Sequence, residues 1–248
     1  MAVSRRTISV IVPACNEARN LEAAVDTVIE AARSFDDFEV LIVNDGSADE
    51  TGEVADRLAA ADSRIHVVHH ESNQGFAAAY GSGLARARMQ YVTFAPGDNE
   101  IASTSLAEIF DAVGKADLVV PYHGTPWKRA FYRRILTWTC VTQINAFFGW
   151  HLHYFQGPTV YPTALARVLP RTTRGFFFIT EMLVYALAAG CTSVEVPLIH
   201  QERAYGRSKA VALANIVDAE KTILRLWWQI RLLGRKAPVV QDELLQRV

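Results

Sequence analysis

Short apolar runs alternate with amphipathic stretches along the first 120 residues of this 248-residue chain. The apolar runs are rich in Val and Ile, as buried β-strands are, whereas between them apolar positions recur every three or four residues, as in helices. Such an alternation predicts an α/β fold with a mostly parallel sheet and helices on both faces. Ligands of these sheets bind beyond the carboxyl ends of the strands. The predicted strands are 8–12, 40–43, 65–68, 91–95 and 118–121, and the predicted helices are 21–35, 75–88, 103–113 and one that follows the capping-box spacing of Ser47 and Glu50.

After Pro121 the alternation gives way to longer helical patterns. The stretch 135–166 lacks Asp, Glu, Lys and Arg, but its Gln, Asn and His residues favour a buried or interfacial segment over a membrane span. No repeat or linker interrupts the chain, so we predict one domain over 1–209 and a helical extension over 210–248. Helices are predicted at 127–148, 181–189 and 210–235, and strands at 159–161 and at 192–196, which Pro197 ends.

Composition narrows the classes of function. The chain is 50% hydrophobic with a formal net charge of −1, which argues against nucleic acid as the main partner. Cys15, Cys140 and Cys191 are far apart, which favours free thiols in a reducing compartment and no zinc site. The apolar run near the N-terminus is too short for a signal peptide, and no run reaches about 18 apolar residues. We therefore expect a cytoplasmic protein without a transmembrane span.

Two acidic turns follow predicted strands. Asp98 and Glu100 come just after the strand 91–95, and Asp45 follows the strand 40–43. Two carboxylates two residues apart can hold one hard divalent cation and leave open positions for phosphate oxygens. Each Asp taken alone is better explained as a turn-former or helix cap. The pair of turns at one edge of the sheet favours a metal-nucleotide site.

Further turns complete a pattern. Residues 13–17 close the first predicted strand, and Gly75 lets the backbone approach a ligand at the start of the Ala-rich helix. Together with 43–51, 97–100, 180–181 and 203–209, these segments resemble in order and spacing the family 2 inverting glycosyltransferases with a GT-A fold. Within that family the chain is most similar to the polyprenyl-phosphate (dolichol-phosphate) sugar synthases, over residues 8–209.

The resemblance implies a UDP- or GDP-linked sugar donor and a Mg²⁺ or Mn²⁺ cofactor. Asp98 falls on the last Asp of the family's DxD motif and Glu100 on a further metal-binding position, whereas Pro96 stands in place of the first Asp. Arg203 and Lys209 fall on the RxxGxSK segment, which contacts the donor phosphates. The nucleotide sugar is then expected to contact Pro13, Cys15, Glu17, Val43, Asp45, Gly97 and Lys209.

The acceptor side follows from the same resemblance. Residues Arg129, Arg133, Arg134 and Ser208 are expected to hold an acceptor phosphate on a polyprenyl lipid. The segment 153–157 departs from the synthases, which usually carry Asp before a Ser-Gly there. A hydroxyl acceptor on a glycan or glycolipid therefore stays open as an alternative.

Catalysis is expected to be electrostatic. The cation on Asp98, together with Arg203, would neutralise the charge that develops on the leaving diphosphate. A phosphate acceptor needs no strong base, but a hydroxyl acceptor does, and Glu181 falls at the family's acidic position for that role. The alternative is that Glu181 only caps its helix.

The predicted last helix carries an apolar face beside basic residues. Its face consists of Ile223, Leu226, Trp227, Ile230 and Leu233. A basic helix with paired Trp residues suits the membrane interface, and the alternative is packing on the domain or on a sister subunit in a homo-oligomer.

Three functions are therefore compatible with the sequence. The leading one is a metal-dependent inverting glycosyltransferase that moves a sugar from a nucleotide to a polyprenyl phosphate at the inner face of the cell membrane. The second keeps the donor but uses a hydroxyl acceptor with Glu181 as base. The third is a protein that binds nucleotide sugars or assembles with partners without turnover. Pro96 favours this alternative, because it replaces the first Asp of the DxD motif.

Overall fold

The computed structural model describes residues 6–125, 131–173, 175–201 and 213–234. Its main sheet has the strand order β3-β2-β1-β4-β6, in which only β6 is antiparallel to its neighbour. Two further strands, β5 and β7, pair in parallel, and a bridge between Val119 and Val160 joins them to the region of β6. The strands are β1 (Thr7–Ala14), β2 (Asp37–Asp45), β3 (Ile65–His70), β4 (Tyr91–Phe94), β5 (Leu118–His123), β6 (Tyr161–Pro162) and β7 (Ser193–Leu198).

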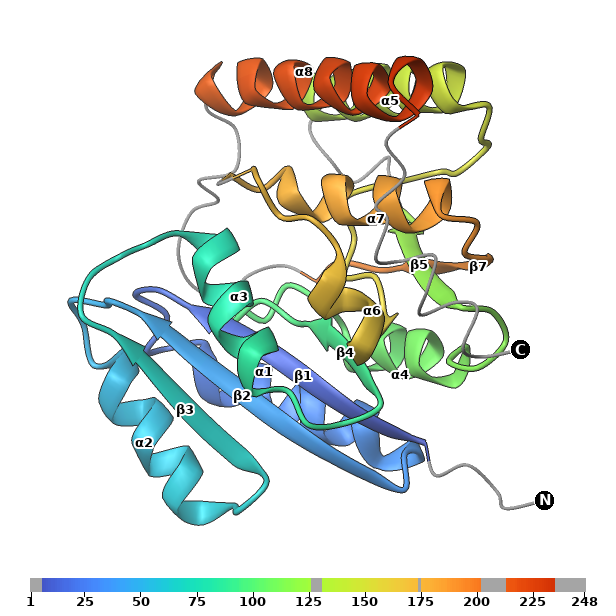
Figure 1. Ribbon diagram of the computed structural model, residues 1–248. Helices are drawn as coiled ribbons and strands as arrows, with labels where there is room; N and C mark the ends of the chain where they lie inside the picture. Colours follow the sequence, from blue (N-terminus) through green and yellow to red (C-terminus); the bar gives the residue numbers. More distant parts are fainter. Residues whose placement is uncertain (1–5, 126–130, 174, 202–212, 235–248) are drawn as a thin grey trace.

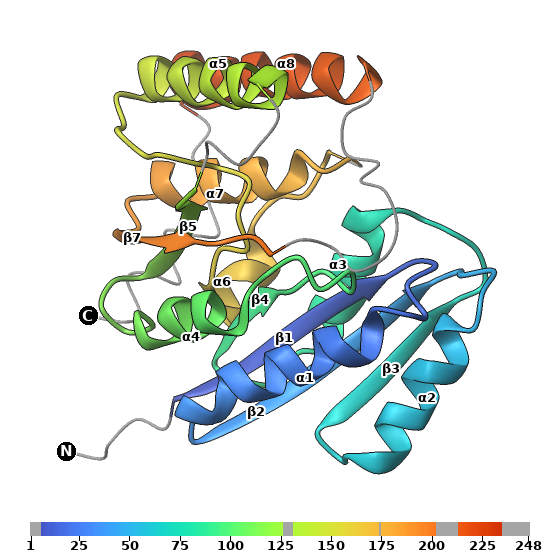
Figure 2. The same ribbon diagram turned by 180° about the vertical axis from the view of Figure 1, so that it is seen from behind.

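Helices cover both faces of the main sheet, as the alternation predicted. One side carries α1 (Leu21–Ala31), the 3₁₀ turn η1 (Ala32–Ser34), α2 (Thr51–Ala61) and α4 (Ser103–Asp111), which Figure 2 shows in front of the strands. The other side carries α3 (Phe76–Arg86), α6 (Thr163–Val168) and α7 (Phe178–Ala188). The mostly parallel α/β fold is therefore confirmed.

Side chains of β1 show how the two layers arise. Ile8, Val10 and Val12 belong to the core cluster on the α1 side, whereas Ile11 belongs to the cluster shared with α3 and α7. Successive residues of a strand point to opposite faces, so a strand with helices on both faces is apolar at nearly every position. This is why β1 reads as a continuous apolar run.

A third layer, the outer tier, lies over α7. It consists of α5 (Phe131–Phe148) and α8 (Leu213–Trp227), with a π-helical turn, η3 (Trp228–Leu232), after α8. Figures 1 and 2 both show α5 and α8 side by side, with α7 between them and the rest of the domain. All residues of α7 from Phe178 to Ala186 are buried, as expected of a helix that is apolar all round.

The inner face of α8 belongs to this core. Ile223 and Leu226 are each 1% exposed and join the same cluster as Ile11 of β1. The predicted C-terminal helix is thus present, and part of its apolar face packs on the domain. The division at residue 209 stays a prediction. Among the described residues, no helix is long and apolar enough to cross a membrane.

Several local predictions were wrong for physical reasons. Ser47 does not cap α2, because its hydroxyl accepts a hydrogen bond from the Asn16 backbone N–H and the helix begins only at Thr51. Pro197 does not end its strand, since it pairs with Tyr122 within β7. The helix containing Glu181 begins at Phe178, and α6 was not predicted at all. A six-residue helix offers too little periodicity to be recognised.

A glycine fixes the turn after β2. Gly46 has φ +60°, and a Cβ there would lie 2.3 Å from the Ser72 carbonyl carbon. We expect Gly46→Ala to lower the free energy of unfolding by about 2 kcal/mol or more, because it adds backbone strain to a clash. Gly81 in α3 is the matched control, since nothing lies within 4 Å of its Cβ position. Gly81→Ala should stabilise the chain by about 0.5–1 kcal/mol. Urea unfolding measures both, and equal effects would contradict this account.

Candidate active site

One large cavity opens at the carboxyl ends of the central strands. Its volume is 1490 Å³, and it is lined by the loops that follow β1, β2 and β4. Parts of α5 and α8 line it as well, so it reaches from the sheet edge to the outer tier. Of the predicted nucleotide-binding residues, the structure brings together at this cavity Pro13, Cys15, Glu17, Asp45 and Gly97.

Hydrogen bonds tie the loops after β1 and β2 together. Asn16, with φ 59°, donates its backbone N–H to the Ser47 hydroxyl at 3.0 Å and accepts from the Ala48 N–H at 2.8 Å. The Glu17 N–H donates to the Thr51 hydroxyl at 2.8 Å. These contacts hold the two loops as one wall of the cavity.

Asp45 organises the next loop. The carboxylate is 3% exposed and accepts the backbone N–H groups of Gln74 at 2.9 Å and Gly75 at 2.8 Å. The His70 ring lies 2.7 Å from it and also contacts Ser82 at 2.8 Å. Asp45 is thus the turn-forming residue that its sequence context allowed, and it also borders the cavity.

Val43 lies elsewhere. Its side chain is fully buried in the core cluster on the α3 side and is not among the described residues that line the cavity. The contact of Val43 with the nucleotide therefore stays a prediction, and its buried side chain leaves only the backbone for it. It is an internal residue of β2, which the sequence pattern itself indicated.

Asp98 and Glu100 form the acidic rim of the cavity. Asp98 is 8% exposed and accepts the Glu100 N–H at 3.2 Å. Between them Asn99 has φ 55°, a conformation in which Asn is several-fold enriched. Thr27 donates to the Asn99 side chain at 3.1 Å, and the Gln201 N–H donates to the Glu100 carbonyl at 2.9 Å. Hydrogen bonds from α1 and from the segment after β7 therefore fix the turn formed by residues 98–100.

The donor set fits a magnesium-type ion that keeps several waters. Asp98 and Glu100 supply hard carboxylate oxygens at the cavity wall, which Mg²⁺ and Mn²⁺ prefer. Within the described part of the chain, no group of three or more His, Cys, Asp or Glu side chains could hold a metal ion. Any ion here would thus rely on few protein ligands together with phosphate oxygens.

Two histidines at the cavity were not predicted. The His123 and His200 ring nitrogens lie 3.0 Å apart, and the ring centroids of His123 and Tyr154 are 4.3 Å apart. His123 ends β5 and His200 follows β7. Their position at the carboxyl ends of two parallel strands is the sequence signal that could have predicted them as site residues. Elsewhere His69 contacts Asp56 and His153 contacts Glu195, both at 2.9 Å.

Glu181 is completely buried. Its carboxylate accepts the backbone N–H groups of Thr172 at 3.0 Å and Thr173 at 2.9 Å, and the Thr172 hydroxyl at 2.6 Å. The Arg225 guanidinium of α8 donates to it at 3.0 Å. Glu181 is not among the described residues that line the cavity. This geometry favours a structural role that joins α7, the segment before it and α8 over the role of a general base.

The cavity also extends to α5. Leu136, Thr137 and Cys140 line it from α5, and burial together with the nearby Glu220 carboxylate raises the pKa of the Cys140 thiol to about 11. Arg134 is exposed on α5. Nothing is described of the Arg133 side chain, and four predicted site residues lie outside the described residues: Arg129, Arg203, Ser208 and Lys209.

Relatives with curated functions match most of the chain. A polyprenol monophosphomannose synthase of Mycolicibacterium smegmatis is 31% identical over 92% of this chain and 88% of its own length. An undecaprenyl-phosphate mannosyltransferase of Micrococcus luteus is 28% identical over 80% of the chain and 85% of that protein. Glycosyltransferase AglD of Haloferax volcanii is 30% identical over 96% of the chain, which spans only 40% of that longer protein.

Solved structures and a family profile agree with these matches. Glucosyl-3-phosphoglycerate synthase from Mycobacterium tuberculosis, in complex with Mn²⁺, UDP and phosphoglyceric acid, superposes with a TM-score of 0.69 at 18% identity, covering 90% of this chain and 78% of that one. At such identity the likeness shows the GT-A fold alone. The profile of glycosyl transferase family 2 matches residues 9–173, which is more than half of the sequence. The chain is therefore a member of glycosyl transferase family 2.

Proposed function

We propose that this chain is a metal-dependent inverting glycosyltransferase that moves a hexose from a UDP- or GDP-linked donor to a polyprenyl phosphate. One observation carries the proposal: a single cavity joins the acidic turn of Asp98 and Glu100 and the loops after β1 and β2 to an apolar end on α5. A polar nucleotide and the hydrocarbon chain of a polyprenyl phosphate need such opposite surroundings within reach of each other. The named functions of the two mannosyl-transferring relatives support the choice of acceptor.

Each part of the cavity has a role in this proposal. Asp98 and Glu100 would hold the divalent ion, whose positive charge stabilises the leaving diphosphate when it is bound. Pro13, Cys15, Glu17, Asp45 and Gly97 would surround the donor nucleotide. The Gly97 backbone N–H donates to the Pro13 carbonyl at 3.1 Å. A Cβ on Gly97 would lie 3.1 Å from the Ala14 Cβ, so a side chain there would push this loop a few tenths of an ångström away from β1.

Basic residues are proposed to bind the phosphate groups of the donor and of the acceptor. Arg203 and Lys209 would contact the donor phosphates, and Arg129, Arg133, Arg134 and Ser208 would hold the acceptor phosphate. That phosphate is already an anion, so it attacks the sugar C1 without a general base. The attack comes from the face opposite the leaving diphosphate and inverts the anomeric centre. The buried, fully engaged carboxylate of Glu181 is compatible with this route and disfavours the hydroxyl acceptor.

The location follows from the acceptor. A polyprenyl lipid stays in the bilayer while a nucleotide sugar is dissolved in water, so the enzyme would work as a peripheral protein at the inner face of the cell membrane. The three cysteines are free in the structure, in keeping with a reducing compartment. Homo-oligomerisation through the outer tier remains a prediction.

Donor binding can be tested first, without lipid. A panel of UDP- and GDP-sugars at about 100 times their Kd should raise Tm by about 5–10 °C with Mn²⁺ or Mg²⁺ and far less with EDTA. With the donor identified, radiolabelled sugar should pass to a short-chain polyprenyl phosphate, and NMR of the product should show an inverted anomeric configuration. Donor binding without any transfer to phosphate or hydroxyl acceptors would instead support the protein that binds nucleotide sugars without turnover.

A further inference from the structure

The outer tier exposes an apolar surface that differs from the one expected from the sequence. Of the predicted face, Ile223 and Leu226 are buried, and the Trp227 ring lies 5.4 Å from Phe147 of α5. Trp227 and Ile230 are partly buried against the same core, so of the predicted face only Leu233, 50% exposed, stays open to a membrane. The large apolar side chains that remain exposed on the tier are Phe131, Tyr132, Ile135, Trp138, Val217, Leu224, Trp228, Leu232 and Leu233, which we call the outer surface.

The outer surface is made by the first half of α5, by α8 and by η3. Gln143 donates to Glu220 at 3.1 Å, and further along Arg231 donates to the Phe148 carbonyl at 2.8 Å, so α5 and α8 run parallel and side by side. Exposed positions recur at helical spacing on each, with Trp138 68% exposed on α5 and Trp228 54% exposed on η3. Exposed large apolar side chains gathered on two neighbouring helices are typical of an interaction site.

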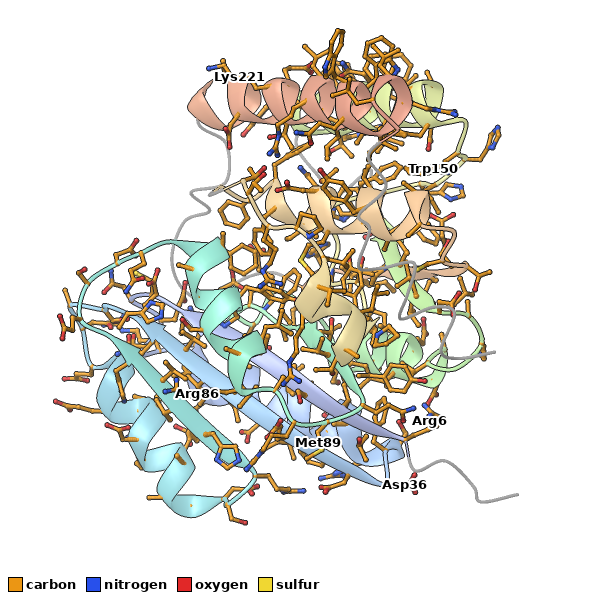
Figure 3. All side chains as sticks on the ribbon, in the orientation of Figure 1. Arg6, Asp36, Arg86, Met89, Trp150 and Lys221 are labelled. Carbon is orange, nitrogen blue, oxygen red and sulfur yellow. The ribbon has the colours of Figure 1, made fainter. Side chains whose placement is uncertain are left out.

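Charge indicates what the outer surface meets. Every exposed charged side chain described on α5, α8 and η3 is basic, namely Arg134, Lys221 and Arg231. Figure 3 shows Lys221 on α8 projecting away from the rest of the molecule. Trp, Tyr and Phe beside Lys and Arg suit the boundary between acyl chains and anionic headgroups. A two-fold contact between copies would instead place the same basic patch against itself.

The outer surface also borders the acceptor end of the cavity. Leu136, Thr137 and Cys140 face the cavity from the same helical turns of α5 that carry Ile135 and Trp138 outward. The helix α5 alone therefore separates the outer surface from the cavity, and its diameter is about 10 Å. A lipid phosphate held in the membrane would need to move only past this helix.

We infer that the outer surface of α5, α8 and η3 lies in the interface of a bilayer containing anionic lipids and brings the cavity to a membrane-bound acceptor. The inference rests on the proposed function for the identity of the acceptor. Binding to the membrane itself is independent of donor chemistry. The two can therefore fail separately.

Co-sedimentation of the full chain with vesicles tests the inference. The wild type should bind phosphatidylcholine vesicles containing a quarter phosphatidylglycerol, and added salt should weaken the binding. Trp138→Ser with Trp228→Ser should lower the partition coefficient about tenfold or more, because two anchors are lost. Lys221→Glu should lower it on anionic vesicles only. Lys115→Glu is the matched control, since Lys115 is exposed just after α4 and should not affect binding. Figures 1 and 2 show α4 on the opposite side of α7 from α5 and α8.

The outcomes separate the two proposals. Wild-type protein that ignores anionic vesicles, or a double Trp variant that binds them undiminished, overturns the inference even if donor-induced stabilisation persists. The inference is equally overturned if light scattering shows a dimer that the Trp substitutions dissociate while vesicle binding is unchanged. If the protein binds vesicles as predicted but no donor raises its Tm, the proposed function is contradicted and the inference about the outer surface is supported.

Discussion

Replacing Asp98 with asparagine should lower kcat for sugar transfer by about 10²–10³ fold, the loss typical when one preorganised charge contact to a leaving group is removed. Asparagine keeps the size of the side chain and can still accept the Glu100 N–H, so the turn should survive. What it loses is the negative charge that holds a divalent ion beside the diphosphate. Initial rates with saturating donor and metal measure the effect.

Controls make this result specific to the metal. Glu100→Gln should cost far less, because the amide oxygen still offers a ligand. Asp26→Asn removes a carboxylate from the exposed face of α1 and should leave the rate unchanged. The donor-induced, Mn²⁺-dependent rise in Tm should disappear in Asp98→Asn alone. An Asp98→Asn enzyme with more than a tenth of wild-type activity would show that the acidic turn does not hold the ion.

Glu181→Ala should lower the free energy of unfolding by about 3–5 kcal/mol, since it leaves the Arg225 guanidinium without its buried counter-charge. Two backbone N–H groups, of Thr172 and Thr173, would lose their acceptor as well. At this chain length the loss corresponds to a fall in Tm of about 6–20 °C. Thermal and urea unfolding measure it, and a double-mutant cycle with Arg225→Ala should show strong coupling.

The same residue decides between the acceptors. Glu181→Gln keeps an acceptor oxygen and should fold well enough to assay at low temperature. A base would lose about 10²–10⁴ fold in rate on this change, with an altered pH profile. A residue that only positions α7 and α8 should leave kcat within a few fold and the pH profile unmoved. A large loss of kcat in a stable Glu181→Gln protein would instead support a hydroxyl acceptor with Glu181 as the general base.

Local pattern and turn chemistry were enough to predict the sheet and much of its edge. Val and Ile runs marked β1 and β2, and the acids after the strands marked the turn at Asp98, because these signals depend on a few neighbouring residues. The second parallel pair escaped recognition as part of the site. His123 and His200 are 77 residues apart, and only the pairing of β5 with β7 brings them together.

What failed depended on partners distant in sequence. Ser47 has the spacing of a helix cap, yet Asn16 competes for its hydroxyl. Glu181 stands at a helix start in either interpretation, and only the position of Arg225 on α8 shows how its charge is compensated. The orientation of α8 was equally hidden, because both of its faces carry apolar residues and packing on α7 selects the one that is buried.

Ile11 of β1 and Ile223 of α8 share one core cluster, whereas Val10 and Val12 belong to a cluster formed almost entirely within the first 120 residues. A growing polypeptide can therefore close the α1 side of the sheet early in translation. The opposite side stays incomplete until α8 has left the ribosome. During that interval the apolar α7 segment lacks the cover that α8 gives it, so we expect a chain truncated before α8 to expose apolar surface and aggregate.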